Sequence, residues 1–413
     1  MKTTGLILIA LFYSLNGYTQ LDTLRLKKLN PDSVKTKPTV IDSSKQKDVE
    51  DLLLKIFSNS KTINKKPTDK KLNISIVPFV GYSLTTGIAA DLPGNVAFFT
   101  SPNHDENISV IQGDLSYDIK TQKIFVSRSE IWTNKNHFKL TSDIRWMQFP
   151  ENTYGIGTAT KPNDADPLVF NWVKVYATVY KKIVPRSNYF FGLGYNLDYH
   201  YNIKQTVNVN KTITDFDTYG GAAKTTSSGL NLNFLYDTRA NGINPLQGTY
   251  ANVGITQNLS ILGSNTNWES IQLDFRKYLK VSRYSNNVLA IWAFVWLTKG
   301  NPPYLDLPYT GGDTFNNTGR GYIQGRFTGK NMLYIETEYR FGILKNGLLG
   351  GVVFTNAESL TEYPSNSFKY VAPAAGAGIR IKINKHSNTN VAIDYGYGIY
   401  HSHGLFVNLG EVF

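Results

Sequence analysis

The stretch Phe138-Lys-Leu-Thr-Ser-Asp-Ile-Arg-Trp146 alternates apolar and polar residues along most of its length. Successive side chains of a β-strand point to opposite faces, so this period of two gives one aromatic and aliphatic face and one charged face. One face suits lipid and the other suits water, which is the pattern of a transmembrane β-barrel strand. The same alternation recurs at 230–234, 271–275 and 333–341.

A soluble β-sandwich would also alternate, but it would bury its apolar faces between two sheets. Aromatic residues near the predicted strand ends favour the barrel, because transmembrane barrels carry aromatic girdles at both membrane interfaces. Short turn sequences tend to alternate with longer loops, as in outer-membrane barrels. Residues 73–413 are therefore predicted to be all-β, forming a sixteen-stranded antiparallel transmembrane β-barrel with both ends in the periplasm. The aromatic residues are Trp132, Trp146, Tyr180 and Trp296.

The first residues have the order of a secretory signal peptide, with Met1-Lys2 followed by an apolar run from Leu6 to Leu15 and then small residues. We predict that residues 1–20 are this signal. The longest later apolar run, 289–297, is well short of the roughly 20 residues that a transmembrane helix needs, so a membrane-bound chain would have to cross as strands. The chain contains no cysteine, so its stability does not depend on disulfides.

Residues 21–72 are polar and basic, with thirteen Lys or Arg against seven Asp or Glu, which contributes half of the formal net charge of +12. They lack strand-like alternation and are predicted to form a mostly disordered, flexible periplasmic tail. Within the tail, one helical face carries Val49, Leu52, Leu53, Ile56 and Phe57, with Ser43 or Ser44 available as a cap. This helix could pack on its own barrel, plug the lumen or dock a partner. The exported location argues against nucleic acid as a partner.

The longest connection, from about Gly300 to Lys330, contains Gly319-Arg320-Gly321-Tyr322. An arginine stays charged at any relevant pH and binds carboxylates through a rigid fork of donors. Glu336 and Glu338 lie on the polar face of the following predicted strand, so an ion pair with Arg320 inside the lumen is predicted. The two glycines would let the backbone turn tightly. A plain solvated loop tip is the alternative.

Together with Gly311-Gly312 before it and Glu338-Tyr-Arg-Phe341 after it, this segment resembles the sixth outer loop of the BamA/TamA superfamily, also called the bacterial surface antigen family. In that family the loop tip folds back into the lumen, where its arginine meets acidic groups on the inner wall. The resemblance covers about residues 73–413. It implies an outer-membrane barrel of a Gram-negative bacterium, in contact with outer-membrane lipid, that inserts or exports other proteins.

A second segment, Tyr236 to Gly248, resembles the family's Asp-x-Arg-Asp-Asn…Pro…Gly connection between two strands. Asp237 and Arg239 can pair across the turn, while Pro245 and Gly248 supply its geometry. We expect this segment to be structural rather than functional.

The sequence also departs from the family pattern. Gly319 precedes the loop arginine, where many members have an aliphatic residue, and Asn356 stands where the family usually has an aspartate. The second change shifts the expected partner of Arg320 toward Glu338. Members that assemble or export proteins carry polypeptide-transport-associated domains, and residues 21–72 lack the βααββ pattern of these domains. We therefore expect a short member without them.

The chain ends in Gly404-Leu-Phe-Val-Asn-Leu-Gly-Glu-Val-Phe413, with alternating apolar residues and a terminal aromatic. This ending resembles the C-terminal β-signal by which assembly machinery recognises outer-membrane barrels. A free last strand can pair edge to edge with a receptor barrel. An ordinary last strand that ends in phenylalanine is the alternative. The candidate signal residues are Gly404, Val407, Leu409 and Phe413.

Three functions remain open at this point. The resemblance predicts a role in outer-membrane protein assembly or protein translocation, directly or as an accessory, with a partner protein in the periplasm or outer membrane. A passive channel or structural barrel could keep the loop motif only for folding. An outer-membrane lipase would need a serine nucleophile and a histidine base, and none of the six histidines lies in a recognisable nucleophile motif. We expect no enzymatic activity, no cofactor and no metal site.

Overall fold

The computed structural model describes residues 46–49, 51–52, 72–83, 87–119, 122–205, 214–219, 221–282 and 285–413, all within the unit from Ser43 to Phe413. The predicted signal peptide (1–20), the two candidate serine caps and most of the predicted tail lie outside these residues. No helix in the described part of the chain is long and apolar enough to cross a membrane.

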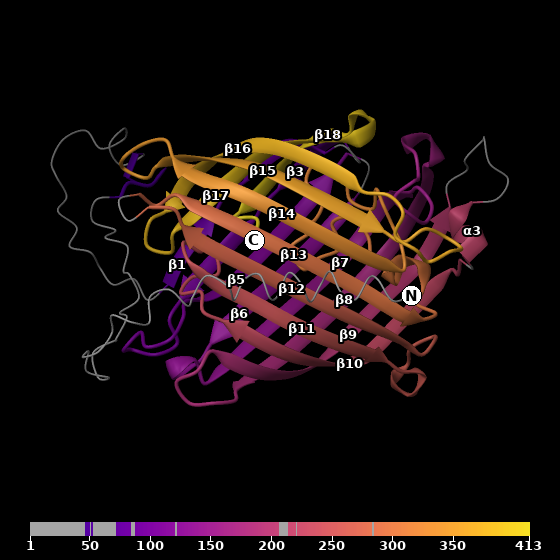
Figure 1. Ribbon diagram of the computed structural model, residues 1–413, viewed down its shortest axis with the longest axis horizontal. Helices are drawn as coiled ribbons and strands as arrows, with labels where there is room; N and C mark the ends of the chain where they lie inside the picture. Colours follow the sequence, from indigo (N-terminus) through magenta and orange to yellow (C-terminus); the bar gives the residue numbers. More distant parts are fainter. Residues whose placement is uncertain are drawn as a thin grey trace, which may run out of the picture. The chain divides into compact units, whose positions relative to one another are not determined.

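The described residues form one antiparallel sheet of eighteen strands, and from β5 onward each strand pairs with the next one in the sequence (Figure 1). Short helical segments occupy some of the connections: η2 (Asn134–Asn136), η3 (Pro162–Asp164), α3 (Asp215–Tyr219), η4 (Ser260–Leu262), η5 (Tyr304–Asp306) and η6 (Ile399–His401). The strands are β1 (Leu72–Ile76), β2 (Phe79–Ser83), β3 (Gly87–Asp91), β4 (Gly94–Phe98), β5 (Ser109–Asp118), β6 (Lys123–Trp132), β7 (Phe138–Thr153), β8 (Asp166–Lys182), β9 (Tyr189–Gln205), β10 (Lys224–Asp237), β11 (Gly248–Asn258), β12 (Trp268–Lys280), β13 (Val288–Gly300), β14 (Asn331–Gly342), β15 (Leu349–Leu360), β16 (Ala372–Asn384), β17 (Thr389–Gly398) and β18 (His403–Leu409).

The predicted count of sixteen strands differs from these eighteen because the first two predicted strands are each broken at a proline. Val77-Pro78 separates β1 from β2, and Leu92-Pro93 separates β3 from β4. β1 pairs with β4 and β2 with β3, while β5 pairs with both β3 and β4. Proline has no N–H to donate to a ladder, so it interrupts a strand without changing its path.

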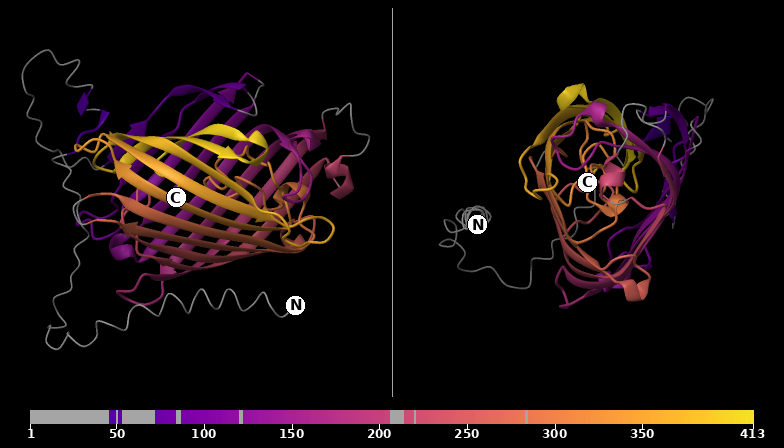
Figure 2. Two further views of the ribbon diagram at one scale, coloured as in Figure 1. Left: turned by 45° about the horizontal axis from the view of Figure 1, so that its top comes forward. Right: turned by 90° about the vertical axis from the view of Figure 1, so that its right-hand side faces the viewer.

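The two faces of the sheet differ as the alternation predicts. In β7, Leu140, Ile144 and Trp146 are exposed on the outer face, at 38 to 40%, while Asp143 and Arg145 are buried on the inner face. The sheet curves around a lumen that is partly filled by protein (Figure 2). In the view along the barrel, the connection between β13 and β14 and the C-terminus both lie inside the ring of strands.

Among the described residues, no backbone ladder joins the first and last strands. β18 pairs with β17 from His403 to Leu409, and within the described residues no part of β18 is in register with β1 or β2. We call this boundary the seam. Two side chains bridge it: Asn95 Nδ2 of β4 donates to Thr389 Oγ1 of β17 at 3.4 Å, and Gln112 Nε2 of β5 donates to the Leu409 carbonyl at 3.2 Å.

The C-terminal residues differ from the sequence expectation. Strand β18 ends at Leu409, and the chain then turns inward at Gly410, which has a φ of 106°. Phe413 is buried, lies 5.2 Å from Trp292 between ring centroids, and accepts a hydrogen bond from Arg340 Nη2 at its carbonyl. Of the other candidate signal residues, Gly404 is buried, Leu409 is half-buried and Val407 is exposed. Their role as a recognition signal stays a prediction.

The predicted helix at 49–57 is described only at its start. Asp48 caps it: the Asp51 N–H donates to Asp48 Oδ1 at 3.0 Å, and the Asp48 N–H donates to Asp51 Oδ2 at 3.2 Å. Lys385, in the turn between β16 and β17, donates through Nζ to both Asp51 oxygens at 2.6 and 2.7 Å. The described residues of this helix thus contact the barrel of their own chain, whereas residues 53–57 lie outside the described part.

Replacing Leu232, near the middle of β10 on the outward face, with arginine should destabilise the barrel in lipid by about 2–4 kcal/mol, because the charge would enter hydrocarbon. Urea unfolding in lipid vesicles measures this free energy. Thr256→Lys, at a position that borders the inner cavity, is the control and should cost about 1 kcal/mol or less. Equal losses for the two variants would contradict the assignment of the faces.

Candidate functional site

Loop six, residues 301–330 between β13 and β14, brings the Arg320 guanidinium into a buried ion cluster. Arg320 is 1% exposed, its Nη1 donates to Asp394 Oδ2 at 2.6 Å, and its Nη2 donates to the carboxylates of Glu336 and Glu338. The two glutamates are two residues apart on β14, so both face inward. The ring of Phe354 lies 3.7 Å from the guanidinium carbon and covers its flat side.

Two more arginines share these carboxylates. Arg340 Nε donates to Glu338 at 2.7 Å, and Arg380 donates through Nη1 to Asp394 at 2.5 Å and through Nε to Glu411 at 2.7 Å. Each member of the cluster is therefore held by at least one charge of opposite sign. A buried charge without such a partner is strongly destabilising, so the cluster can persist only as a set.

The structure brings together the predicted partners of Arg320, but it gives Asn356 another role and adds one residue. The Asn356 side-chain amide donates to the backbone carbonyl of Arg320 at 2.9 Å and does not contact the guanidinium. Asp394 was missed by the sequence analysis. The alternation of Ile393-Asp-Tyr-Gly-Tyr-Gly398 places this aspartate on the inward face of β17, but nothing in the sequence indicates that β17 lies beside the loop tip.

Glycines on both sides make the docking of the loop tip possible. Gly319 and Gly321 have φ angles of 79° and 115°, which side chains disfavour. A Cβ atom at Gly396 of β17 would lie 2.7 Å from the Gly321 nitrogen, and one at Gly398 would lie 2.4 Å from the Tyr322 ring. The backbone of the loop tip therefore lies directly against β17.

Tyr322, two residues after Arg320, also holds the loop tip in place. Its hydroxyl donates to the Pro373 carbonyl at 2.6 Å and accepts from the Ile399 N–H at 3.0 Å, and its ring packs edge-on against Phe327. The four residues of the predicted loop motif are all buried, which excludes the alternative of a solvated loop tip.

Loop six has a second anchor that the sequence analysis did not predict. Arg145 of β7 donates to the Thr314 carbonyl at 2.6 Å and to Asn316 Oδ1 at 2.8 Å, and Arg128 of β6 donates to the same Asn316 oxygen at 2.9 Å. Asp143 holds Arg145 through two hydrogen bonds of 2.7 Å. Because β6 and β7 lie far from β14 and β17 in the strand order, loop six crosses the lumen.

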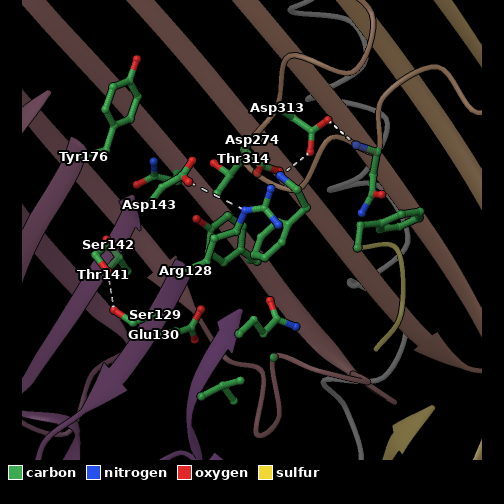
Figure 3. A pocket seen from close by; sticks show the side chains of 18 of the residues that line it. Arg128, Ser129, Glu130, Thr141, Ser142, Asp143, Tyr176, Asp274, Asp313 and Thr314 are labelled. Atoms are coloured by element: carbon green, nitrogen blue, oxygen red, sulfur yellow. Dashed lines mark hydrogen bonds and ion pairs between the residues drawn. The ribbon is translucent and has the colours of Figure 1, made fainter. Parts of the chain in front are cut away.

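Between loop six and the strands there remains a polar cavity of about 340 Å³ (Figure 3). Arg128, Glu130 and Asp143 line it from β6 and β7, Asp274 lines it from β12, and Asp313 belongs to loop six. Charges of both signs face this space. The cavity is therefore lined in part by charged side chains.

The start of loop six packs against α3, in the connection between β9 and β10. Tyr304 and Leu307 are buried in an apolar cluster with Phe216 of α3. Asp306 accepts a hydrogen bond from the Ser227 hydroxyl at 2.6 Å. Burial raises the pKa of Asp306 well above its usual range, and the nearby charge of Asp198 adds to this effect.

The turn between β10 and β11, residues 238–247, has the internal pairing that the sequence predicted. Arg239 donates to Asp237 through Nε at 3.0 Å and through Nη2 at 2.9 Å, and Lys139 of β7 lies 3.3 Å from the same carboxylate. Gly248 closes the turn with a φ of 121°, and Pro245 lies within it. These contacts anchor the turn to β10 and to β7.

A family model described as the Omp85 superfamily domain matches residues 99–404. The chain belongs to the Omp85 superfamily. It is an outer-membrane β-barrel of a Gram-negative bacterium. We expect the end at which β1 begins and β18 ends to face the periplasm. The kinship inferred from loop six is thereby confirmed at the level of the family.

Solved structures share this fold at low sequence identity. CdiB from Acinetobacter baumannii matches with 13% identity over 83% of this chain and a TM-score of 0.52, and CdiB from Escherichia coli with 10% identity over 83% and a TM-score of 0.53. This chain spans 60% and 63% of those two chains. BamA from Haemophilus ducreyi lacking POTRA domains 1-3 matches with 15% identity over 82% of this chain and 69% of that chain, with a TM-score of 0.49. A search of curated proteins gave no match.

For this Omp85 barrel, Arg320→Ala should lower the free energy of unfolding by about 3–5 kcal/mol, because three carboxylates would stay buried without their shared partner. Urea titration followed by the mobility of the unheated barrel on gels measures the loss. Arg320→Lys should lose less, since it keeps the charge but not the planar fork. An unchanged urea midpoint for Arg320→Ala would contradict the role of this cluster.

Gly396→Val should displace the tip of loop six, because the new side chain would occupy the space of the Gly321 backbone. Valine suits a strand, so the pairing of β17 should persist. We expect faster cleavage within residues 301–330 by protease added to the outer surface of whole cells. Ile393→Val, on the same strand, is the control and should cleave at the parent rate. Protection of loop six in Gly396→Val would show that the tip can dock elsewhere.

Proposed function

We propose that this Omp85 barrel acts in outer-membrane protein assembly or protein translocation, either directly or as an accessory subunit. The observation that carries the proposal is the seam, where β18 has no backbone ladder with β1 or β2 among the described residues. Unpaired strand edges present N–H and C=O groups that can pair with another chain. Membership of the superfamily supports the same role.

Loop six supports the proposal because it can hold the other strands in place while the first and last strands move apart. One anchor joins Arg320 to β14 and β17, and the other joins Thr314 and Asn316 to Arg145 of β7. Neither of these two anchors is made to β1, β2 or β18, the strands at the seam. A barrel braced in this way can separate its first and last strands without losing the remaining ladders.

The passive channel fits the geometry less well. Loop six crosses the lumen, the C-terminal residues turn into it, and a cavity of about 340 Å³ remains. A wide passive pore needs a continuous aqueous path, which these segments obstruct. This obstruction favours the assembly or translocation role over a wide passive channel.

A partner protein in the periplasm or outer membrane is part of the proposal. Asp48 and Asp51 place the start of the N-terminal helix against the β16–β17 turn, close to the seam in the strand order. A protein that binds the chain preceding β1 would thus act next to the last strands. The identity of the client is left to experiment.

Depletion of the protein should lower the outer-membrane level of at least one other barrel or the release of at least one exported protein. Quantitative proteomics of outer membranes and culture medium measures this change. Parent protein and Lys299→Ala, an exposed cation at the end of β13, should restore the levels. Arg320→Ala should not, even when its folded amount is matched to the parent. Unaltered levels of all other proteins, together with no co-purified partner, would favour the passive channel instead.

A further inference from the structure

The β10–β11 turn reaches across the periplasmic mouth of the barrel to the seam. We call residues 241–246 the strap. Residues 237–239 lead into the strap, and we call them its root. The root is held by ion pairs, because Asp237 binds both Arg239 and Lys139, and the Arg239 guanidinium carbon lies 4.3 Å from the centre of the Tyr250 ring. In the succession of ladders from β1 to β18, the strap joins β10 and β11, about halfway between the two strands at the seam.

On one side, the strap binds the last strands. Asn241 Nδ2 donates to the Ser387 carbonyl at 2.9 Å, and Asn244 Nδ2 donates to the Asn388 carbonyl at 3.3 Å, both in the β16–β17 turn. The Ile243 carbonyl accepts from the Glu411 N–H, just after β18, at 2.8 Å. These bonds connect the strap to the residues just before β17 and just after β18.

On the other side, the strap packs on the first strands. The Ile243 side chain is 4% exposed and belongs to an apolar cluster with Ala97 of β4, Ile108, and Val110 of β5. Ile243 therefore contacts the chain on both sides of the seam: its carbonyl binds Glu411, just after β18, and its side chain packs against β4 and β5. The strap thus supplies a connection at a boundary that has no backbone ladder in the described residues.

The tip of the strap is built to dock as a unit. Asn241 Oδ1 accepts from the Ile243 N–H at 2.7 Å and from the Asn244 N–H at 3.3 Å, so the side chain orders the backbone that it precedes. The contacts of the strap are neutral hydrogen bonds and two aliphatic side chains, Ile243 and Leu246, whereas the root is held by buried ion pairs. Neutral hydrogen bonds exchange with water at little net cost, so the tip can detach while the root stays fixed.

We propose that the strap is a latch that holds the seam shut at the periplasmic end, and that its release allows the first and last strands to separate. The proposal rests on the proposed function for its purpose, since an assembly or translocation barrel needs the seam to open. The latch itself is a mechanical property of the purified barrel. It can be measured without a client.

The first test labels a single cysteine at the seam, which is possible because the chain has no cysteine of its own. In Asn95→Cys the thiol replaces a side chain that is 2% exposed and contacts Thr389. In vesicles that hold the full-length barrel, a bulky maleimide should label it roughly tenfold faster when Asn241→Ala and Asn244→Ala are added. Asn287→Ala, an asparagine in the β12–β13 turn, is the matched control and should leave the rate unchanged. Equal rates in all three proteins would overturn the proposal.

The second test separates opening of the seam from simple uncovering of the mouth. In planar bilayers, the Asn241→Ala and Asn244→Ala protein should carry more current than the parent. A disulfide between Asn95→Cys and Thr389→Cys closes the seam but leaves the mouth uncovered, so it should remove the added current until a reductant is supplied. Added current that persists in the oxidised protein would show that the strap only plugs the lumen, and the latch would be refuted.

A third variant keeps the proposal testable if the double alanine protein does not fold. Asn244→Cys with Asn388→Cys places a disulfide where the strap meets the β16–β17 turn in an otherwise unchanged barrel. Oxidation should reduce the spontaneous current, and reduction should restore it. Identical currents in both states would overturn the latch. Client levels do not enter any of these measurements, so failure of the latch and failure of the proposed function are distinguishable.

Discussion

The buried guanidinium of Arg320 is the interaction on which the rest of the barrel interior depends. It reaches Glu336 and Glu338 on β14 and Asp394 on β17, and these carboxylates also hold Arg340 and Arg380. Burial of so many charges is tolerated only because each has a partner of opposite sign. The position of the loop tip, the glycines of β17 and the covering ring of Phe354 all follow from the need to complete this cluster.

With that cluster in place, loop six spans the lumen to Arg145 and Arg128, and the wall is braced from inside. The brace gives a physical reason why the sheet can leave its first and last strands without a ladder. The seam is bridged instead by side chains, by the C-terminal residues that turn inward, and by the strap at the periplasmic mouth. Such contacts are individually weak, which makes the seam the part of the wall that separates at the least cost.

The sequence predicted the membrane-facing and lumen-facing sides correctly, and it placed Arg320 near Glu336 and Glu338. It counted sixteen strands because alternation continues through Pro78 and Pro93, where the structure breaks the ladder. It missed Asp394 and the second anchor at Asn316, since neither is close in sequence to its partner. It expected Phe413 at the end of the last strand, because an apolar terminal residue fits the alternation as well as a buried lumen position does.

The sequence by itself determined the period of the strands, the faces of the sheet, and the family resemblance of loop six. These properties depend on residues that are adjacent in the chain, where the direction of each side chain follows from backbone geometry. Only the tertiary structure decided which strands border the loop tip, where the C-terminus lies, and how the strap meets the seam. Those contacts join residues far apart in sequence, and only the folded barrel offsets the entropy of bringing them together.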